Sequence, residues 1–320
     1  MPFLRLRIGT ALLSLAAVLI VSSEAEAWQR QPDARPAVPA RPAAKEGEKT
    51  NYPEMKVDIT IKGTSSRQAW QDARNRLPMN LLSETKQARV NAVLARNSLF
   101  RRLPQIDFDA EPEVYSWFTQ NPEVAVSTWR VLKISEFKLK PAGNNVWLGE
   151  AQDGSKGTIE ILHRTANSQL LLCEGEYKTP LLTRPIRASA VMHLQTQFTR
   201  KPNGEGHVTH GVDLFVAFPS QTVDTVAKVI SPVSNMIADR NFKELSLFVR
   251  FMSIAMQKQP GWVEQLSTRL DDITPKQKDE LLNMSARIFI ASRKRALKND
   301  GVRQATLEQI VAPYKQPSGR

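Results

Sequence analysis

The spacing of hydrophobic residues changes partway along this chain. Between residues 134 and 218, apolar and polar side chains alternate, which is the period of strands with one buried face. Asp153-Gly154 and Asn203-Gly204 are turn pairs typical of hairpins, so the stretch predicts an antiparallel meander sheet of about six strands. We expect these strands at residues 134–140, 145–152, 156–164, 168–178, 185–199 and 206–218.

After the last strand the spacing becomes helical. Apolar residues recur every three or four positions from Pro219 to Pro260, which predicts one long amphipathic helix. Pro232 lies inside it and predicts a kink. Because residues 245–252 are apolar nearly all round, we expect a second helix, at residues 275–298, to cover their other side. The stripe consists of Val226, Ile230, Val233, Ile237, Leu245, Phe248, Met252 and Ala255.

Shorter elements flank the meander. Residues 57–61 alternate and predict a strand, and residues 99–103 predict the first strand of the main sheet. Thr274-Pro275-Lys276-Gln277 is a capping-box sequence with proline at the first helical position, and Gly301 fits the end of that helix. Other helices are expected at residues 65–76, 83–96, 111–119, 122–132 and 262–270, with one more turn from about Ala305.

Together these elements predict an α+β fold, with the sheet covered on one face by the long C-terminal helix and with extra flanking helices. Strand 185–199 has the clearest two-sided pattern. Its apolar face carries Ile186, Ala188, Ala190, Met192, Leu194 and Phe198, and its polar face carries Arg187, Ser189, His193, Gln195 and Gln197. We expect the polar face to meet water, as in antiparallel sheets with one covered face.

Alternation also sorts the polar residues that carry chemistry. His207 and His210 fall on opposite faces of one strand and cannot chelate one metal ion. The polar residues assigned to the interior are His163, Cys173, Tyr177, His210 and Asn241. They predict either a ligand cavity between sheet and long helix or a set of separately satisfied core groups. A metal or catalytic site using His163 or His210 is the third hypothesis.

The N-terminal residues predict where the protein is located. A 14-residue apolar run, Ile8 to Val21, follows two arginines, and Ala25-Glu26-Ala27 fits a cleavage pattern. Residues 1–27 therefore predict a secretory signal peptide, and the protein is expected to be exported, either periplasmic or secreted. A retained membrane anchor is the alternative, although the run is shorter than the ~20 residues that span a bilayer. Cys173 is the single cysteine, so no intramolecular disulfide is expected.

Composition divides the rest of the chain. A proline-rich segment with almost no large apolar residues predicts a disordered linker. The expected division is a linker at residues 28–51, a basic helical extension at 52–98, an α+β domain at 99–270 and C-terminal basic helices at 271–320 that pack on the domain.

The net charge of +12 is concentrated outside the meander. Residues 65–105 carry eight basic and two acidic groups, and residues 275–320 carry ten and four. Such a field favours an anionic envelope polymer or a lipid surface as partner, while nucleic acid is the less favoured one. The candidate anion-binding residues are Arg293, Lys294, Arg295 and Lys298. A solvated, solubilising surface is the alternative.

Familiar catalytic and cofactor patterns are missing. The chain has no G-x-S-x-G, H-E-x-x-H, phosphate-binding loop, G-x-G-x-x-G or C-x-x-C sequence, and we predict no cofactor and no metal. Acidic residues at every second position, Asp107, Asp109, Glu111 and Glu113, are similar to a calcium loop. Proline at position 112 replaces the glycine that such a loop needs, so these carboxylates are expected to cap the following helix.

The order of elements over residues 99–258 resembles the helix-grip arrangement of START-like lipid-transfer domains: a strand, two short helices at 111–132, a meander and a long closing helix. The resemblance implies a cavity for an apolar ligand between sheet and helix. Large residues on the inner faces and the basic helices at both ends depart from it. The leading hypothesis is a non-enzymatic exported module that binds an apolar ligand or a protein partner there. The alternatives are an envelope-associated scaffold that binds anionic polymer or membrane, and an enzyme of unknown class.

Overall fold

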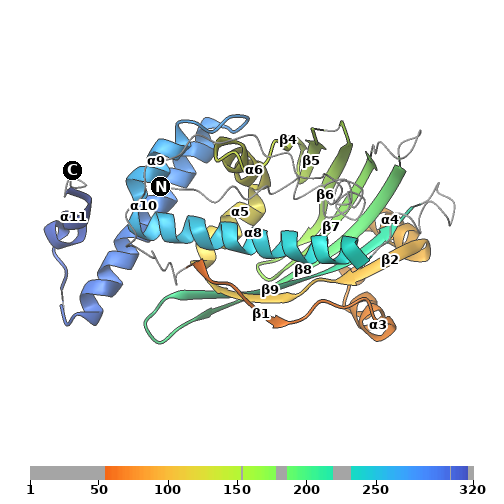
Figure 1. Cartoon of the computed structure of the whole chain (residues 1–320), viewed down its shortest axis with the longest axis horizontal. Coiled ribbons are helices and arrows are strands. Elements are labelled where there is room, and N and C mark those ends of the chain that lie inside the picture. The colour runs from red at the N-terminus through yellow and green to blue at the C-terminus, as the bar shows by residue number, and fades with distance from the viewer. Residues whose placement is uncertain (1–54, 153, 178–185, 219–231, 303, 316–320) are drawn as a thin grey trace, which may run out of the picture.

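The computed structural model describes residues 55–152, 154–177, 186–218, 232–302 and 304–315. The predicted signal peptide, the linker and residues 219–231 of the predicted long helix lie outside this part of the chain. Within it, the protein has an α+β fold built on a large, open antiparallel sheet (Figure 1).

The nine strands described here follow the order β1-β3-β9-β8-β7-β6-β5-β4, and β2 also pairs with β9. Strands β4 to β9 pair with their sequence neighbours in antiparallel fashion, which confirms the predicted meander. The bounds are β1 (Asp58–Ile61), β2 (Asn97–Arg102), β3 (Gln105–Asp109), β4 (Lys138–Gly143), β5 (Val146–Glu150), β6 (Lys156–Arg164), β7 (Ser168–Tyr177), β8 (Ile186–Arg200) and β9 (Gly206–Ala217).

Strand β3 was not predicted. It pairs with the first half of β9, with Phe108 opposite Val208, while β2 pairs with the second half. Ile106 and Phe108 are buried and alternate with Asp107 and Asp109, which is the period of a strand. The carboxylates had been assigned to a helix cap, but the first two of them lie on this strand.

The inner face of the sheet packs against a layer of helices. Figure 1 shows α8 running along the sheet, with α9 and α10 gathered at the end where α8 ends. Residues Leu281, Met284 and Ile288 of α10 are buried in the same core as Phe248 and Met252 of α8, as predicted. The bounds are α5 (Pro112–Gln120), α6 (Pro122–Val131), α8 (Pro232–Lys258), α9 (Pro260–Ser267), α10 (Pro275–Asn299) and α11 (Leu307–Lys315).

The apolar stripe of α8 is buried toward its C-terminal end. Phe248, Met252 and Ala255 are buried, and Phe242 joins them, whereas Ile237 and Leu245 are only partly buried. The predicted kink at Pro232 falls at the boundary of the described residues, because α8 begins there. The capping box at Thr274 and Gln277 is present at the start of α10. Among the described helices, none combines the length and the apolar composition needed to cross a bilayer.

The outer face of the sheet is covered as well, which corrects the expectation that it meets water. Helices α3 (Arg67–Asn75) and α4 (Glu84–Ala95), with the short helix η3 (Met79–Leu81) between them, lie on it. They bury a second apolar cluster that includes Leu170, Leu172, Val191 and Phe215. These apolar residues interrupt the polar faces of β7, β8 and β9, and one-sided alternation overlooked them.

Candidate functional site

A chain of hydrogen bonds joins the sheet to two helices around His210. The Tyr115 hydroxyl, on α5, lies 2.9 Å from His210 Nδ1 and 3.1 Å from Thr196 Oγ1 of β8. His210 Nε2 lies 2.8 Å from Ser246 Oγ on α8. The imidazole ring stacks on Phe242, with ring centroids 4.3 Å apart. His210 thus ties β9 to two helices of the inner layer, α5 and α8.

Which groups donate and which accept along this series of hydrogen bonds follows from Ser246. Ser246 donates its hydroxyl proton to the Phe242 carbonyl at 2.9 Å, so its oxygen accepts from His210 Nε2–H. The imidazole is then the Nε2–H tautomer, and its Nδ1 accepts from the Tyr115 hydroxyl. Thr196 donates to Tyr115 in turn. Every polar group has a partner without any net charge, as buried networks require.

Burial keeps this cluster neutral. It lowers the pKa of His210 to about 3, because no nearby charge compensates the loss of hydration. It also raises the pKa of Tyr115, against the weaker effect of the hydrogen bond to Thr196. A histidine that cannot hold a proton near neutral pH, and whose two nitrogens are bonded within the protein, is suited to support the fold rather than to transfer protons.

The structure separates the other residues predicted for the interior site. Cys173 is buried and pairs with Ala190, six residues along β8 from Thr196, which is ~20 Å. Burial and, to a smaller extent, the Glu174 carboxylate raise the pKa of the Cys173 thiol to about 12, so the thiol stays protonated. Asn241 is buried on α8 beside Phe242. Tyr177 ends β7, and its side chain lies outside the described residues.

His163 lies on the opposite face from the one predicted. The pairing of β6 with β7 shifts by one residue between Ile161 and His163, so His163 stands opposite Leu170 rather than in register with the inner residues. A bulge of this kind reverses which face later residues occupy. Lys86 of α4 donates to the carbonyl of Leu162 at the shift, at 2.9 Å. His163 and His210 therefore cannot belong to one catalytic site.

The predicted anion-binding residues are only partly free. Arg295 donates to Glu111, a buried carboxylate, and Arg293 donates to the Gln309 carbonyl of α11 at 3.5 Å. Lys294 and Lys298 are exposed in the last turns of α10. The group of four divides into two arginines that bond within the protein and two lysines that face solvent.

The acidic residues at positions 107–113 hold elements together. Asp109 accepts from Lys201 at 2.6 Å and lies 2.8 Å from His207 Nδ1. Burial alone raises the pKa of Asp109, but hydrogen bonds from these two partners lower it below its usual value. Glu113 accepts from Arg287 of α10. In the described residues, no three His, Cys, Asp or Glu side chains form a cluster suited to a metal ion.

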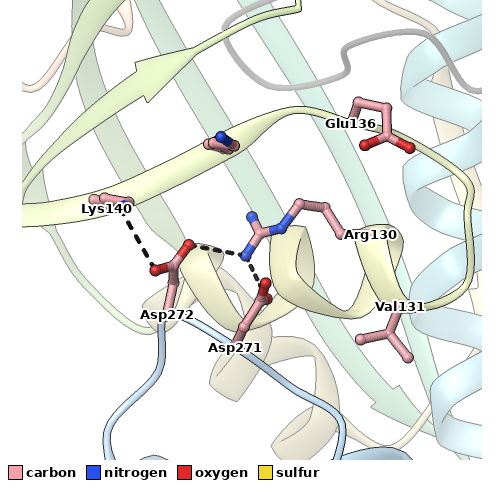
Figure 2. Close-up of a pocket in the computed structure, with 7 residues that line it drawn as sticks. Arg130, Val131, Glu136, Lys140, Asp271 and Asp272 are labelled. Carbon is pink, nitrogen blue, oxygen red and sulfur yellow. Dashed lines mark hydrogen bonds and ion pairs between the residues drawn. The ribbon is translucent and has the colours of Figure 1, made fainter.

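A hollow of about 460 Å³ opens between the end of α6, the start of β4 and the loop joining α9 to α10 (Figure 2). Figure 2 shows Arg130 reaching across to the two aspartates of that loop, Asp271 at 2.5 Å and Asp272 at 3.1 Å. Lys140 lies 3.6 Å from Asp272. The lining residues are Arg130, Val131, Glu136, Lys138, Lys140, Asp271 and Asp272.

The backbone is unusual at one residue of this hollow. Asp272 has a φ value of 55°, a conformation that is uncommon outside glycine. Asp271 is fixed as well, because its N–H donates to Ser127 Oγ at 3.0 Å. Burial raises the pKa of Asp271, but Arg130 and Ser127 lower it below its usual value. Sequence reasoning missed this site, since no local pattern brings residue 130 to residue 271.

Comparison with known proteins adds no family. The chain matches no known protein family and no curated protein. It is similar to the solved structure of an uncharacterised protein from Rhizobium leguminosarum, over 48% of this chain and 95% of that one. The sequence identity is 13% and the TM-score is 0.27, and we infer neither fold nor function from this similarity. The class that the described residues define is an α+β protein whose open antiparallel sheet carries helices on both faces.

Proposed function

We propose that the protein is an exported, non-enzymatic binding module, and that it holds a protein partner at the charged hollow beside β4. The hollow carries the proposal. Its volume lies in the range of ~300–1,000 Å³ common for binding sites. Its walls are charged rather than apolar, which suits a polar segment of a protein better than a lipid.

The interior supports this choice over an apolar ligand. His210 and its hydrogen-bonded neighbours are packed by Phe108, Phe242 and Phe198 and satisfy one another. A ligand placed there would have to displace aromatic side chains and leave buried polar groups without partners. The catalytic alternative, which uses His163 or His210, has less support still, because both ring nitrogens of His210 are bonded within the protein.

The position of the hollow adds further support. Among the strands that the structure describes, β4 is the last of the sheet, and one of its edges has no described strand beside it. Lys138 and Lys140 are exposed on β4, and Glu136 is exposed just before it. A partner segment lying along β4 would meet charges of both signs, which favours a specific orientation more than high affinity.

A paired set of charge reversals tests this function. The tagged protein is purified from its native host after mild cross-linking, as wild type, as Lys138→Glu/Lys140→Glu and as Lys294→Glu/Lys298→Glu. We expect one protein to co-purify in stoichiometric amount with the wild type and the second variant, and about tenfold less with the first. Equal recovery with both variants would contradict the proposed site, and a co-purifying lipid would favour the apolar-ligand alternative.

A second candidate is an envelope-associated scaffold that binds an anionic polymer or lipid surface through α10. The exposed lysines Lys294 and Lys298 favour it, since the part of α10 that carries them projects from the body of the molecule (Figure 1). For this candidate, the charge reversal on α10 is the test and the charge reversal on β4 is the control. Retention on vesicles containing anionic lipid would fall for Lys294→Glu/Lys298→Glu and with added salt, and would be unchanged for the pair on β4.

The proposal includes the resemblance to helix-grip domains. The arrangement of α5, α6, the meander and α8 supports this resemblance, because α8 packs on α5 and on β3. The second helical layer on the outer face is an addition to that arrangement. A helix-grip ancestry would therefore imply a fold whose interior is now filled and whose binding has moved to the surface.

A further inference from the structure

Helices α3 and α4 form a lid over the outer face of the sheet, which we call the N-terminal cover (residues 67–95). Its apolar contacts come from buried side chains such as Leu77, Leu82 and Val90. Its polar contacts come mainly from cations. Arg76 bonds to Asp213, Lys86 to the Leu162 carbonyl, and Arg89 to two carboxylates. Attachment therefore depends on charge as well as on apolar contact.

Under α3 the charge is already positive. Asp213 of β9 is buried, and two guanidinium groups bond to it: Arg102 at 2.6 Å and Arg76 at 3.1 Å. Arg102 also donates to the Ala69 carbonyl of α3 at 3.1 Å. One carboxylate thus serves two cations. The carboxylate itself is buried, whereas Arg102 is 24% exposed and Arg76 is 49% exposed.

His193 lies in this layer and pairs with Asp213 across β8 and β9. It is buried, and both ring nitrogens are bonded. The amide nitrogen of Gln195 donates to Nδ1 at 3.1 Å, so Nε2–H donates to Ser168 Oγ at 2.9 Å. The ring is therefore neutral in this arrangement, and a second proton on Nδ1 would meet an amide donor.

His163 of β6 is the second histidine here. Its Nε2 is buried and has no hydrogen-bond partner. The cation of Lys86 lies at the neighbouring Leu162 carbonyl. Burial lowers the pKa of His193, the Asp213 carboxylate raises it, and Arg76 and His163 lower it again. The charged and titratable groups acting on His193 are thus Asp213, Arg76 and His163, and Arg102 shares the Asp213 carboxylate.

We propose that His193 is an acid-sensitive latch, whose protonation releases the N-terminal cover from the outer face of the sheet. A proton on His193 adds a cation beside Arg76 and Arg102, which already share the one carboxylate of Asp213. Release lets water reach His193 and exposes the apolar residues of the second cluster, among them Leu172, Val191 and Phe215. The result is a new apolar surface that is hidden at neutral pH.

The direction of the pH dependence of cover opening follows from proton linkage. A histidine with a lowered pKa in the covered state binds its proton more readily when the cover is open. The cover is therefore most stable above the ordinary histidine pKa of about 6.5 and loosens as the pH falls below it. Between pH 7.5 and pH 5.0, the opening equilibrium shifts by up to about 30-fold for a single histidine that stays neutral when covered.

Amide hydrogen exchange measured by mass spectrometry tests the latch in the wild-type protein. Exchange is followed at pH 7.5 and pH 5.0 and corrected for the intrinsic rate. We expect protection in peptides from residues 67–95 to fall at least about tenfold more than in peptides from 242–256 and 281–289, which belong to the inner core. Equal changes in the two sets, or no change in the cover, would overturn the proposal.

A variant assigns the effect to His193. His193→Gln keeps a hydrogen-bonding side chain that does not titrate, so it should abolish the pH-dependent loss. His207→Gln is the matched control, because His207 lies against Asp109 at the other end of β9. Persistence of the full loss in His193→Gln would refute the latch, and the wild-type measurement stands alone if that variant does not fold.

Discussion

The two faces of the sheet treat a buried histidine differently. Strands β8 and β9 present His210 to the inner face and His193 to the outer face, and both are 4% exposed. His210 lies in a neutral chain of hydroxyl groups and aromatic rings. His193 lies near Asp213 and Arg76, in a layer of ions.

The difference concerns what protonation requires. The inner histidine sits between the sheet and a helix layer that includes α5 and α8, so it can take up a proton only when the fold opens as a whole. The outer histidine is separated from water by the N-terminal cover, so local opening is enough. Acid should therefore affect the inner face through global stability and the outer face through a local change.

The largest effect should come from the outer ion layer. Asp213→Asn removes the buried carboxylate that the half-exposed Arg76 and the partly buried Arg102 share. We expect a loss of about 2–4 kcal/mol in the free energy of unfolding, measured by urea denaturation. Glu174→Gln is the control, because Glu174 is half exposed in its pair with Arg89; a loss of equal size there would show that burial does not set the cost.

The inner histidine should control the pH dependence of global stability. With a pKa of about 3 when folded and about 6.5 when unfolded, neutral His210 stabilises the fold fully above pH 6.5. That contribution falls by about 2 kcal/mol at pH 5. Urea denaturation across this range should therefore give a steeper pH dependence for the wild type than for His210→Gln. Identical slopes would contradict the assignment.

A smaller effect should follow from shortening the inner chain. Tyr115→Phe removes the hydroxyl that bonds to His210 and Thr196 and should cost about 1–2 kcal/mol, because buried partners are left unsatisfied. A double-mutant cycle with Thr196→Val measures the coupling. Strictly additive losses would mean that the two hydroxyl groups do not act as one network.

The smallest effect should be on the rim of the cover. Arg89→Met removes ion pairs with Glu160 and Glu174, both at least partly exposed, and should change the free energy of unfolding by less than about 1 kcal/mol. Thermal unfolding at low and high salt is the measurement. A larger, salt-insensitive loss would place these pairs among the buried contacts of the outer face instead.

Much of the fold could be predicted from local patterns. Alternation located the strands from β5 to β9 within about two residues, because the two-residue period of a half-buried strand is a property of neighbouring side chains. The capping box located the start of α10 for the same kind of reason. Strand β3 was missed, since its acidic residues also fit a helix cap, and only pairing with β9 distinguishes the two.

The candidate sites were less accessible. His163 was placed on the wrong face, because a one-residue bulge leaves no mark on the period of the sequence. Arg295 was assigned to an anion site, and only folding brings it to Glu111. The hollow at Arg130 joins residues about 140 positions apart. Such contacts depend on how whole elements pack.

By itself, the sequence determined the meander, the amphipathic long helix, the C-terminal helix that covers its second side, and the inward position of His210. Each depends on residues close together in the chain, where side-chain period and capping chemistry act. Tertiary structure alone decided that both faces of the sheet are covered, that His163 joins His193 rather than His210, and that a charged hollow opens beside β4. These features depend on register and on packing between distant segments, whose energies no local pattern records.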